Sequence, residues 1–406
     1  MNILYYDGLK GASFSTASIH IYEVLNGLSR LGHNVVALDS GSPEDIIEAY
    51  INRRSSPWER LKNSVPQSRV LRPILGGIVI LWLFLREIYL FISAFIVIAR
   101  HKGRFDIIYR RHYLLNGGYL LARLFKIPFV KEMNGIVADD AKITQRGDRV
   151  SFWLMDRLER LNMPRADKII VVSSRMKKTL QKEYGVPGNK IIVIQNGANT
   201  DLFKPMDTTR VREELGLNRS SNYVCFVGAF WWYEGVEYLI RSIPLILEQC
   251  PQARFLIVGD GQLREELIEL AKQIGVSDKV MFTGMVPYQK VPLYINASDL
   301  CVVPATRQRN ERIGASPLKL CEYMACEKPV IASRVDGLEI VEENNAGILV
   351  KPESPRSLAT AIIKLIQNQE LRKQMGERGR QYVLKNQSWE RVAERVADVC
   401  QSLVDD

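Results

Sequence analysis

The sequence predicts an α/β protein built of two doubly wound domains that face a cleft, and three observations support this. The chain has 406 residues, enough for two domains of about 150–200 residues each. Short apolar runs alternate with amphipathic helical stretches, which is typical of a parallel sheet covered on both faces. The alternation begins again in the middle of the chain. Because ligands of open α/β sheets bind beyond the carboxyl ends of the strands, both domains should offer loops to the cleft.

The first domain is expected over residues 1–204, with an apolar insert at 74–99. Helical stretches such as 17–31 and 175–184 separate its strands. Buried strands are predicted at 3–6, 35–38, 107–109, 129–131, 169–172 and 191–194.

The second domain is expected over residues 205–384. Its strands are predicted at 223–227, 255–258, 280–282, 300–303, 330–332 and 348–350, and its helices at 236–248, 263–274, 318–325 and 358–367. An amphipathic helical stretch at 389–404 follows the completed second sheet and could cap either domain. We expect residues 385–406 to cross back to the first domain.

The net charge of +10 suits an acidic partner, whether nucleic acid, an anionic membrane or a phosphate-bearing substrate. A nucleic-acid partner would rest on charge alone and is not expected. Much of the excess lies in residues 51–73, where the only acid is Glu59. The basic residues there are Arg53, Arg54, Arg60, Lys62, Arg69 and Arg72.

The six cysteines form no Cys-x-x-Cys pair and have no cluster of histidines nearby. They therefore predict neither a metal site nor a disulfide framework, and they fit a reducing cytoplasm. Residues 1–6 carry no basic region of a signal peptide and are interpreted as the first strand.

The segment 74–99 is apolar except at Arg86, Glu87 and Ser93, and on length alone it could span a bilayer. Charges at its midpoint would each cost about 2–3.5 kcal/mol there. Spanning would also divide one sheet across the membrane. The remaining interpretations are a buried pair of helices or a helix lying in the membrane interface, which the neighbouring basic stretch favours. We therefore expect a cytoplasmic protein, peripheral on the inner face of the cell membrane, with an anionic membrane surface as a partner.

Three strand ends carry glycines. In residues 7–13, Gly11 and Ala12 lie in a strand-to-helix turn whose backbone N–H groups could approach a phosphate, although a tight turn explains the glycine equally well. Gly259 and Asp260 repeat that pattern in the second domain. The strand end with Gly284 and Met285 could contact a nucleobase edge, or could be an ordinary strand terminus.

The strongest segment is 314–325, followed by 328–333. Ser316 is predicted to cap a helix and Pro317 to occupy its first turn. The N–H groups of Leu318 and Lys319 would then be available to an anion. Glu322 lies one turn further on the same face, where its carboxylate could bind two ribose hydroxyls or could simply face solvent.

These segments resemble the family 4 retaining glycosyltransferases, which have the GT-B fold, over nearly the whole chain. The resemblance is carried by the strand-one glycine turn, 195–199 with Phe203, 226–228, 257–261, 282–284, 298–300 with Pro304, and 316–333. It implies that the second domain binds a UDP- or GDP-linked sugar as co-substrate. It also implies catalysis with no metal and no cofactor.

The resemblance assigns donor-site roles residue by residue. Glu322 matches the second Glu of the family's Glu-x7-Glu, but the first position is Gly314, and Glu311 could substitute for it. The family's usual Arg directly after Gly228 and its usual Lys just before Gly235 are replaced by Ala229 and Glu234. The charge of the leaving diphosphate would then be neutralised by the helix N-terminus at Ser316 or by a nearby cation. The candidate cations are Lys319, Arg307, Arg309 and Arg312.

In the first domain, Asn134 occupies the position at which the family often has a His beside the reacting sugar. An amide accepts no proton as a base does, so its role would be hydrogen bonding. Glu132 is the nearest carboxylate, and His112 and His20 are further candidates to line the cleft.

The resemblance thus implies a retaining hexosyltransferase with a hydroxyl acceptor. We expect that acceptor to be a lipid-linked or polysaccharide glycan of the cell envelope. The alternative is a non-catalytic GT-B subunit that binds a partner or a membrane, which Ala229 and Glu234 suggest.

Overall fold

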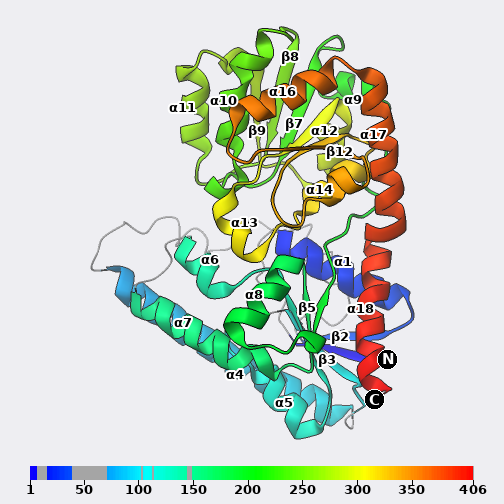
Figure 1. The fold of residues 1–406 in the computed structure, drawn as a ribbon. Coiled ribbons are helices and arrows are strands. Elements are labelled where there is room, and N and C mark those ends of the chain that lie inside the picture. Colours follow the sequence, from blue (N-terminus) through cyan, green and yellow to red (C-terminus); the bar gives the residue numbers. More distant parts are fainter. Residues whose placement is uncertain (7–15, 39–70, 102–103, 112–113, 144–148, 406) are drawn as a thin grey trace. The chain divides into compact units, whose positions relative to one another are not determined.

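The computed structural model describes residues 1–6, 16–38, 71–101, 104–111, 114–143 and 149–405 (Figure 1). The chain divides into two compact units. Unit 1 comprises Met1–Val172, Met176–Ile194 and Val392–Asp406, and unit 2 comprises Ser173–Arg175 and Gln195–Arg391. Each unit contains one six-stranded sheet flanked by helices, so the predicted α/β architecture of two doubly wound domains is confirmed.

The sheet of unit 1 is wholly parallel, in the order β2-β1-β3-β4-β5-β6. Its strands are mostly apolar because both faces are covered, although β3 and β4 also carry charged residues. They are β1 (Asn2–Tyr5), β2 (Asn34–Ala37), β3 (Ile107–Arg111), β4 (Phe129–Met133), β5 (Lys168–Val171) and β6 (Ile191–Val193).

The helices of unit 1 connect these strands. They are α1 (Thr16–Arg30), α4 (Leu71–Arg100), α5 (Gly117–Phe125), α6 (Val137–Ile143), α7 (Arg149–Asn162) and α8 (Ser174–Tyr184). Most of the final helix, α18 (Trp389–Val404), also belongs to unit 1, where Arg395 Nη2 donates a 2.7 Å hydrogen bond to the carbonyl of Val193.

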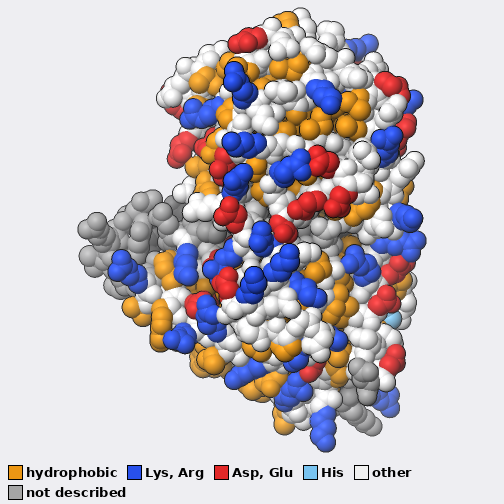
Figure 2. Space-filling model, viewed as in Figure 1, with side chains coloured by type: hydrophobic (Ala, Val, Ile, Leu, Met, Phe, Trp, Pro, Cys, Tyr) orange, Lys and Arg blue, Asp and Glu red, His pale blue; other side chains and the backbone are white. Residues whose placement is uncertain are grey.

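The apolar insert is one continuous helix, α4, so of the two interpretations the pair of helices is wrong. Arg86 and Glu87 do not break the helix, because straight-chain charged residues have high helix propensity. Among the described residues, no helix is long and apolar enough to cross a membrane. Figure 2 shows hydrophobic side chains mixed with Lys and Arg over the region where Figure 1 places α4, α5 and α7.

The sheet of unit 2 is also parallel, in the order β12-β11-β10-β7-β8-β9. The chain order therefore reverses between β7 and β10, which is where open sheets of this kind bind ligands. The strands are β7 (Asn222–Val227), β8 (Ala253–Val258), β9 (Val280–Gly284), β10 (Leu300–Val303), β11 (Val330–Ser333) and β12 (Gly347–Val350).

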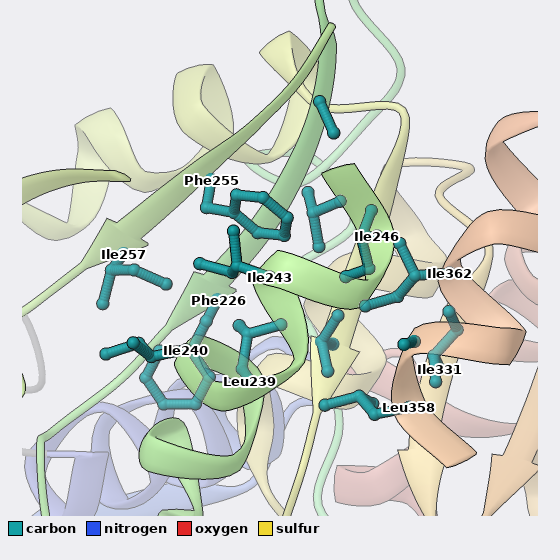
Figure 3. Close-up of a cluster of buried hydrophobic side chains, with 14 of the residues drawn as sticks. Phe226, Leu239, Ile240, Ile243, Ile246, Phe255, Ile257, Ile331, Leu358 and Ile362 are labelled. Carbon is teal, nitrogen blue, oxygen red and sulfur yellow. The ribbon is translucent and has the colours of Figure 1, made fainter. Parts of the chain in front are cut away.

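The core of unit 2 forms where α10 (Val236–Leu247) packs on the sheet beside α16 (Pro355–Ile366). Leu239, Ile240, Ile243 and Ile246 recur at helical spacing and are wholly buried (Figure 3). The other helices are α9 (Thr208–Glu214), α11 (Arg264–Gln273), α12 (Val291–Ala297), α13 (Arg307–Ile313), α14 (Leu318–Ala325), α15 (Ile340–Glu343) and α17 (Gln369–Tyr382).

Candidate functional site

Glycines from three neighbouring strands meet at the carboxyl edge of the unit 2 sheet. The N–H of Gly228 donates to the carbonyl of Val258 at 2.9 Å, and the N–H of Gly259 donates to the carbonyl of Gly284 at 3.1 Å. A Cβ at Gly259 would lie 2.0 Å from the Gly228 carbonyl oxygen, so no larger residue fits. The predicted glycine positions therefore form one closely packed backbone surface. The Asp260 carboxylate accepts the N–H of Gly261 at 2.7 Å.

The helix α14 has the predicted bounds, Leu318–Ala325, but its cap lies one residue later than predicted. Its N-cap is Pro317, and Leu318 is the first helical residue. Ser316 is not the cap, because its hydroxyl oxygen accepts the N–H of Asn196 at 2.9 Å. The first-turn N–H groups of an α-helix have no intrahelical acceptor, so Leu318 and Lys319 can still present theirs to an anion.

Lys319 forms an ion pair with Glu234, with 2.5 Å between Nζ and Oε2. The ammonium also lies 4.3 Å from the centre of the Phe226 ring. Its position over the end of β7 depends on Gly228, because a Cβ there would lie 2.4 Å from Nζ. Glu234 ends a short 3-10 helix, Trp232–Glu234, that stands where the sequence departs from the family. Glu234, which replaces the family's usual Lys, is therefore paired with Lys319, the cation predicted to bind phosphate.

Glu322 is 5% exposed, and its Oε1 accepts a 2.9 Å hydrogen bond from the hydroxyl of Tyr288. Tyr288 follows β9 in a short 3-10 helix, and its ring packs on Phe203 with centroids 5.3 Å apart. Met285, in the loop between β9 and this 3-10 helix, is 72% exposed. The buried position rules out the solvent-facing alternative for Glu322. Tyr288 was not predicted, because its partner is on another element and no local pattern marks the contact.

Gly314 connects α13 to α14 with φ 66° and ψ −176°. A Cβ there would lie 2.8 Å from the Ser173 hydroxyl oxygen and 3.1 Å from the carbonyl oxygen of Asp336. The chain therefore has no room for a side chain at this position of the motif. Glu311 is exposed on α13.

The aromatic segment 230–233 contacts one of the other candidate cations. The guanidinium of Arg309 lies 4.7 Å from the centre of the Tyr233 ring, and Tyr233 stacks on Trp231 at an interplanar angle of 7°. The side chain of Arg307 is exposed, and its backbone N–H donates a 3.0 Å hydrogen bond to the Glu353 carboxylate. Among the candidate cations, Lys319 is a nearest neighbour of Gly228.

In unit 1, Glu132 is buried at the end of β4 between two partners. His20 Nε2, from α1, forms a short contact with Oε1, and the Tyr109 hydroxyl donates to Oε2 at 2.5 Å. Burial opposes ionisation of Glu132, but the charge and hydrogen bond of His20 hold its pKa below the ordinary value. Burial and the charge of Glu132 raise the pKa of Tyr109 well above its ordinary value. Glu132 is therefore an internal anion, not a surface acid.

Asn134 lies two residues beyond Glu132, immediately after β4 ends at Met133. Its Oδ1 is buried without a hydrogen-bond partner among the described residues. The structure thus brings Asn134, Glu132 and His20 to the same end of β4. Three predicted positions, Gly11, Ala12 and His112, lie outside the described residues.

Comparison with known proteins identifies the family. The family model "Glycosyltransferase Family 4" matches residues 17–202, and "Glycosyl transferases group 1" matches residues 207–382. The uncharacterized glycosyltransferase MJ1178 of Methanocaldococcus jannaschii is 32% identical, over 71% of this chain and 72% of that protein. A D-inositol 3-phosphate glycosyltransferase of Corynebacterium diphtheriae is 29% identical, over 74% and 71% respectively.

Solved structures agree in fold. A sucrose-phosphate synthase from Thermosynechococcus elongatus superposes with a TM-score of 0.74 at 21% identity, covering 100% of both chains. Anabaena Alr3699/HepE in complex with UDP superposes with a TM-score of 0.71 at 20% identity, covering 99% of this chain and 100% of that one. The predicted GT-B fold is confirmed.

Proposed function

We propose, since this chain belongs to the group 1 glycosyltransferases of family 4, that it transfers a hexose from a UDP- or GDP-linked donor to a hydroxyl acceptor with retention of configuration. The observation that carries the proposal is the buried carboxylate of Glu322, held by Tyr288 one turn beyond the N-terminus of α14. A fixed carboxylate at that place can accept hydrogen bonds from two ribose hydroxyls. HepE binds UDP and UDP-glucose, which supports a nucleotide-sugar donor.

The diphosphate would bind between the glycine surface and α14. Lys319 already donates to Glu234, but an ammonium has three N–H donors and can keep that partner while it binds a phosphate oxygen. Because Glu234 offsets part of the charge, the N–H groups of Leu318 and Lys319 must supply the rest. We propose that Gly228, Gly259, Asp260, Gly284 and Met285 line the remainder of the donor site.

The reaction we propose needs no resident metal or cofactor. The bond from the anomeric carbon to the diphosphate breaks, the acceptor oxygen bonds to the same face of that carbon, and the departing diphosphate takes the hydroxyl proton. The protein then positions the reactants and stabilises the charge that develops on the leaving group. The family resemblance supports this course.

For the acceptor, we propose a lipid-linked or polysaccharide glycan of the cell envelope, used at the inner face of the cell membrane. The net charge of +10 and the apolar helix α4 support this location. The alternative function, a non-catalytic GT-B subunit, is favoured only by Ala229 and Glu234.

The test is a panel of UDP- and GDP-sugars offered with a membrane lipid extract and scored by release of nucleoside diphosphate. Glu322→Ala should raise the donor KM about ten- to a hundredfold, because hydrogen bonds to a charged group contribute about 1.5–3 kcal/mol each. Tyr288→Phe should raise it about two- to tenfold with little change in kcat, because it removes one neutral donor from the carboxylate.

Glu265→Ala is the matched control, because Glu265 is an acid of the same unit with a side chain 85% exposed. Release by the wild type and unchanged kinetics in Glu322→Ala would remove the assignment of Glu322. No release with any donor, while nucleotide still binds, would favour the non-catalytic subunit.

A further inference from the structure

The helix α4 has one buried face and one exposed apolar face. Leu90, Ala94 and Ile98 recur every four residues and are at most 1% exposed. The opposite side carries large hydrophobic side chains that are 42–58% exposed. These include Phe84, Leu85, Ile88, Ile92, Phe95 and Ile96. An exposed apolar stripe of this size on a protein surface marks an interaction site.

The stripe continues onto the neighbouring helix α5. Phe95 contacts Phe125 with ring centroids 5.6 Å apart, which joins the two helices. Leu120 and Leu124, one turn apart on α5, are 57% and 61% exposed. We call the exposed apolar side chains of α4 and α5 together the α4–α5 face.

A buried ion pair fixes the rotation of α4 so that this face points outward. Glu87 receives two 2.7 Å hydrogen bonds from Arg110, one to each carboxylate oxygen, and a third from the N–H of Gly117 at the start of α5. Arg110 is 1% exposed. Turning the stripe inward would withdraw Glu87 and leave Arg110 buried without its counter-ion. Glu87, the acid in the middle of an apolar helix, thus fixes the rotation of that helix.

The charges around the face are basic. Arg100, Arg104 and Lys126 are exposed at the C-terminal ends of α4 and α5, and Arg123, also exposed, is paired with Asp167 at 2.7 Å. Within 84–101, 104–111 and 114–126, the only acids are Glu87 and Asp106, and neither is exposed. A surface of this kind is complementary to one that is apolar within and anionic at its boundary.

We propose that the α4–α5 face docks on an anionic phospholipid bilayer, with α4 lying in the plane of the interface and its arginines among the headgroups. The α4–α5 face is thus the surface that would hold the enzyme at the membrane. Only this membrane location rests on the proposed function. Lipid binding is measured without turnover, so failure of this proposal and failure of the donor-site proposal are distinguishable.

The experiment is sedimentation of the full chain with vesicles of phosphatidylcholine, with or without phosphatidylglycerol, at low and high salt. Binding should require phosphatidylglycerol and should weaken as salt rises. The double variant Ile92→Glu/Phe95→Glu should weaken binding about tenfold or more, because it places two anions in the part of the face that would enter the bilayer. Arg100→Gln/Arg104→Gln should weaken binding to the anionic vesicles.

Met281→Glu is the matched control, since Met281 is 45% exposed on unit 2, and it should bind as the wild type does. Circular dichroism should show that the variants unfold at the wild-type temperature. A wild type that remains in the supernatant, or a double variant that binds equally well, would overturn the proposal. A dimer that forms without vesicles and is lost in the double variant would also overturn it, and would assign the face to a second copy of the chain.

Discussion

At the scale of single residues, Gly314 explains why the first carboxylate of the family motif is missing. Its backbone has φ 66° and ψ −176°, a region that essentially only glycine occupies. Ser173 and Asp336 fill the space that a Cβ would need.

We therefore predict that Gly314→Glu, which restores the family residue, destabilises the protein. The strained backbone costs about 1–3 kcal/mol, and the contact with Ser173 adds to it. Urea unfolding measures the loss, and Glu311→Gln on the exposed side of α13 should leave the free energy of unfolding within about 0.5 kcal/mol. A Gly314→Glu variant as stable as the wild type and more active would contradict this account.

The pair of Lys319 and Glu234 gives a second prediction at this scale. Lys319→Ala should lower kcat about ten- to a hundredfold, because it removes a cation and leaves the Glu234 carboxylate facing the leaving diphosphate. Glu234→Gln should change kcat less, since Lys319 and the α14 N–H groups remain.

The double variant Lys319→Ala/Glu234→Gln should recover part of the loss, because it removes the uncompensated anion. Steady-state kinetics of the four proteins form a double-mutant cycle that measures this coupling. Additive effects would show that the two side chains do not couple in catalysis, and a larger loss in Glu234→Gln than in Lys319→Ala would show that the segment around Glu234 handles the phosphates instead.

At the scale of secondary-structure elements, Glu87 anchors α4 to β3 and α5. We predict that Glu87→Ala lowers the free energy of unfolding by about 3–5 kcal/mol, because it leaves the Arg110 charge buried without its partner. The neighbouring residue is a natural control, since Arg86 is only half-buried and Arg86→Ala should cost much less. Denaturant midpoints of the two variants decide this, and equal losses would refute the anchoring role.

The strand β4 carries a second buried charge, Lys131, which is 1% exposed and donates to the carbonyl of Asn162 at 3.1 Å. Burial, and next the positive charge of Arg110, lower the pKa of Lys131 from 10.5 to about 7. Between these two pKa values the unfolded chain binds more protons at this residue than the folded chain does. Its contribution to the free energy of unfolding therefore rises with pH, by at most about 1.4 kcal/mol per pH unit.

We predict that Lys131→Met removes this slope between about pH 7 and pH 10 and stabilises the protein at neutral pH. The exposed Lys126→Met should keep the wild-type slope. Unfolding free energies measured across the pH series test both statements. A Lys131→Met profile parallel to that of the wild type would mean that Lys131 keeps an ordinary pKa in the fold.

At the scale of the whole molecule, ligand binding to unit 2 should be visible as thermal stability. A ligand that binds only the folded state adds RT ln(1 + [L]/Kd), about 2.7 kcal/mol at a hundredfold excess over Kd. We predict that either UDP or GDP raises the melting temperature and that Glu322→Ala reduces the rise, because binding that is ten- to a hundredfold weaker leaves about 0.4–1.4 kcal/mol at the same nucleotide concentration. Calorimetry with UDP, GDP and ADP would identify the base. If the two units melt separately, only one transition should move, and a shift of the other would place the nucleotide site in unit 1.

Much of this protein could be predicted from its sequence. The strands at 107–109, 129–131 and 330–332 were predicted because a buried parallel strand is a local apolar run, and local runs are visible without a fold. The GT-B fold and the family followed from motifs in order along the chain. The cap of α14 was placed one residue early, at Ser316, because the serine hydroxyl accepts the N–H of Asn196 from a distant turn.

Only the tertiary structure decided the contacts between distant residues. Lys319 meets Glu234, Tyr288 meets Glu322, Gly314 meets Ser173, and Glu87 meets Arg110, each across a different pair of elements. The sequence alone determined which elements form and which motifs they carry, since these depend on neighbouring residues. The partner and exposure of each side chain depend on how elements pack in space, and no local pattern contains that information.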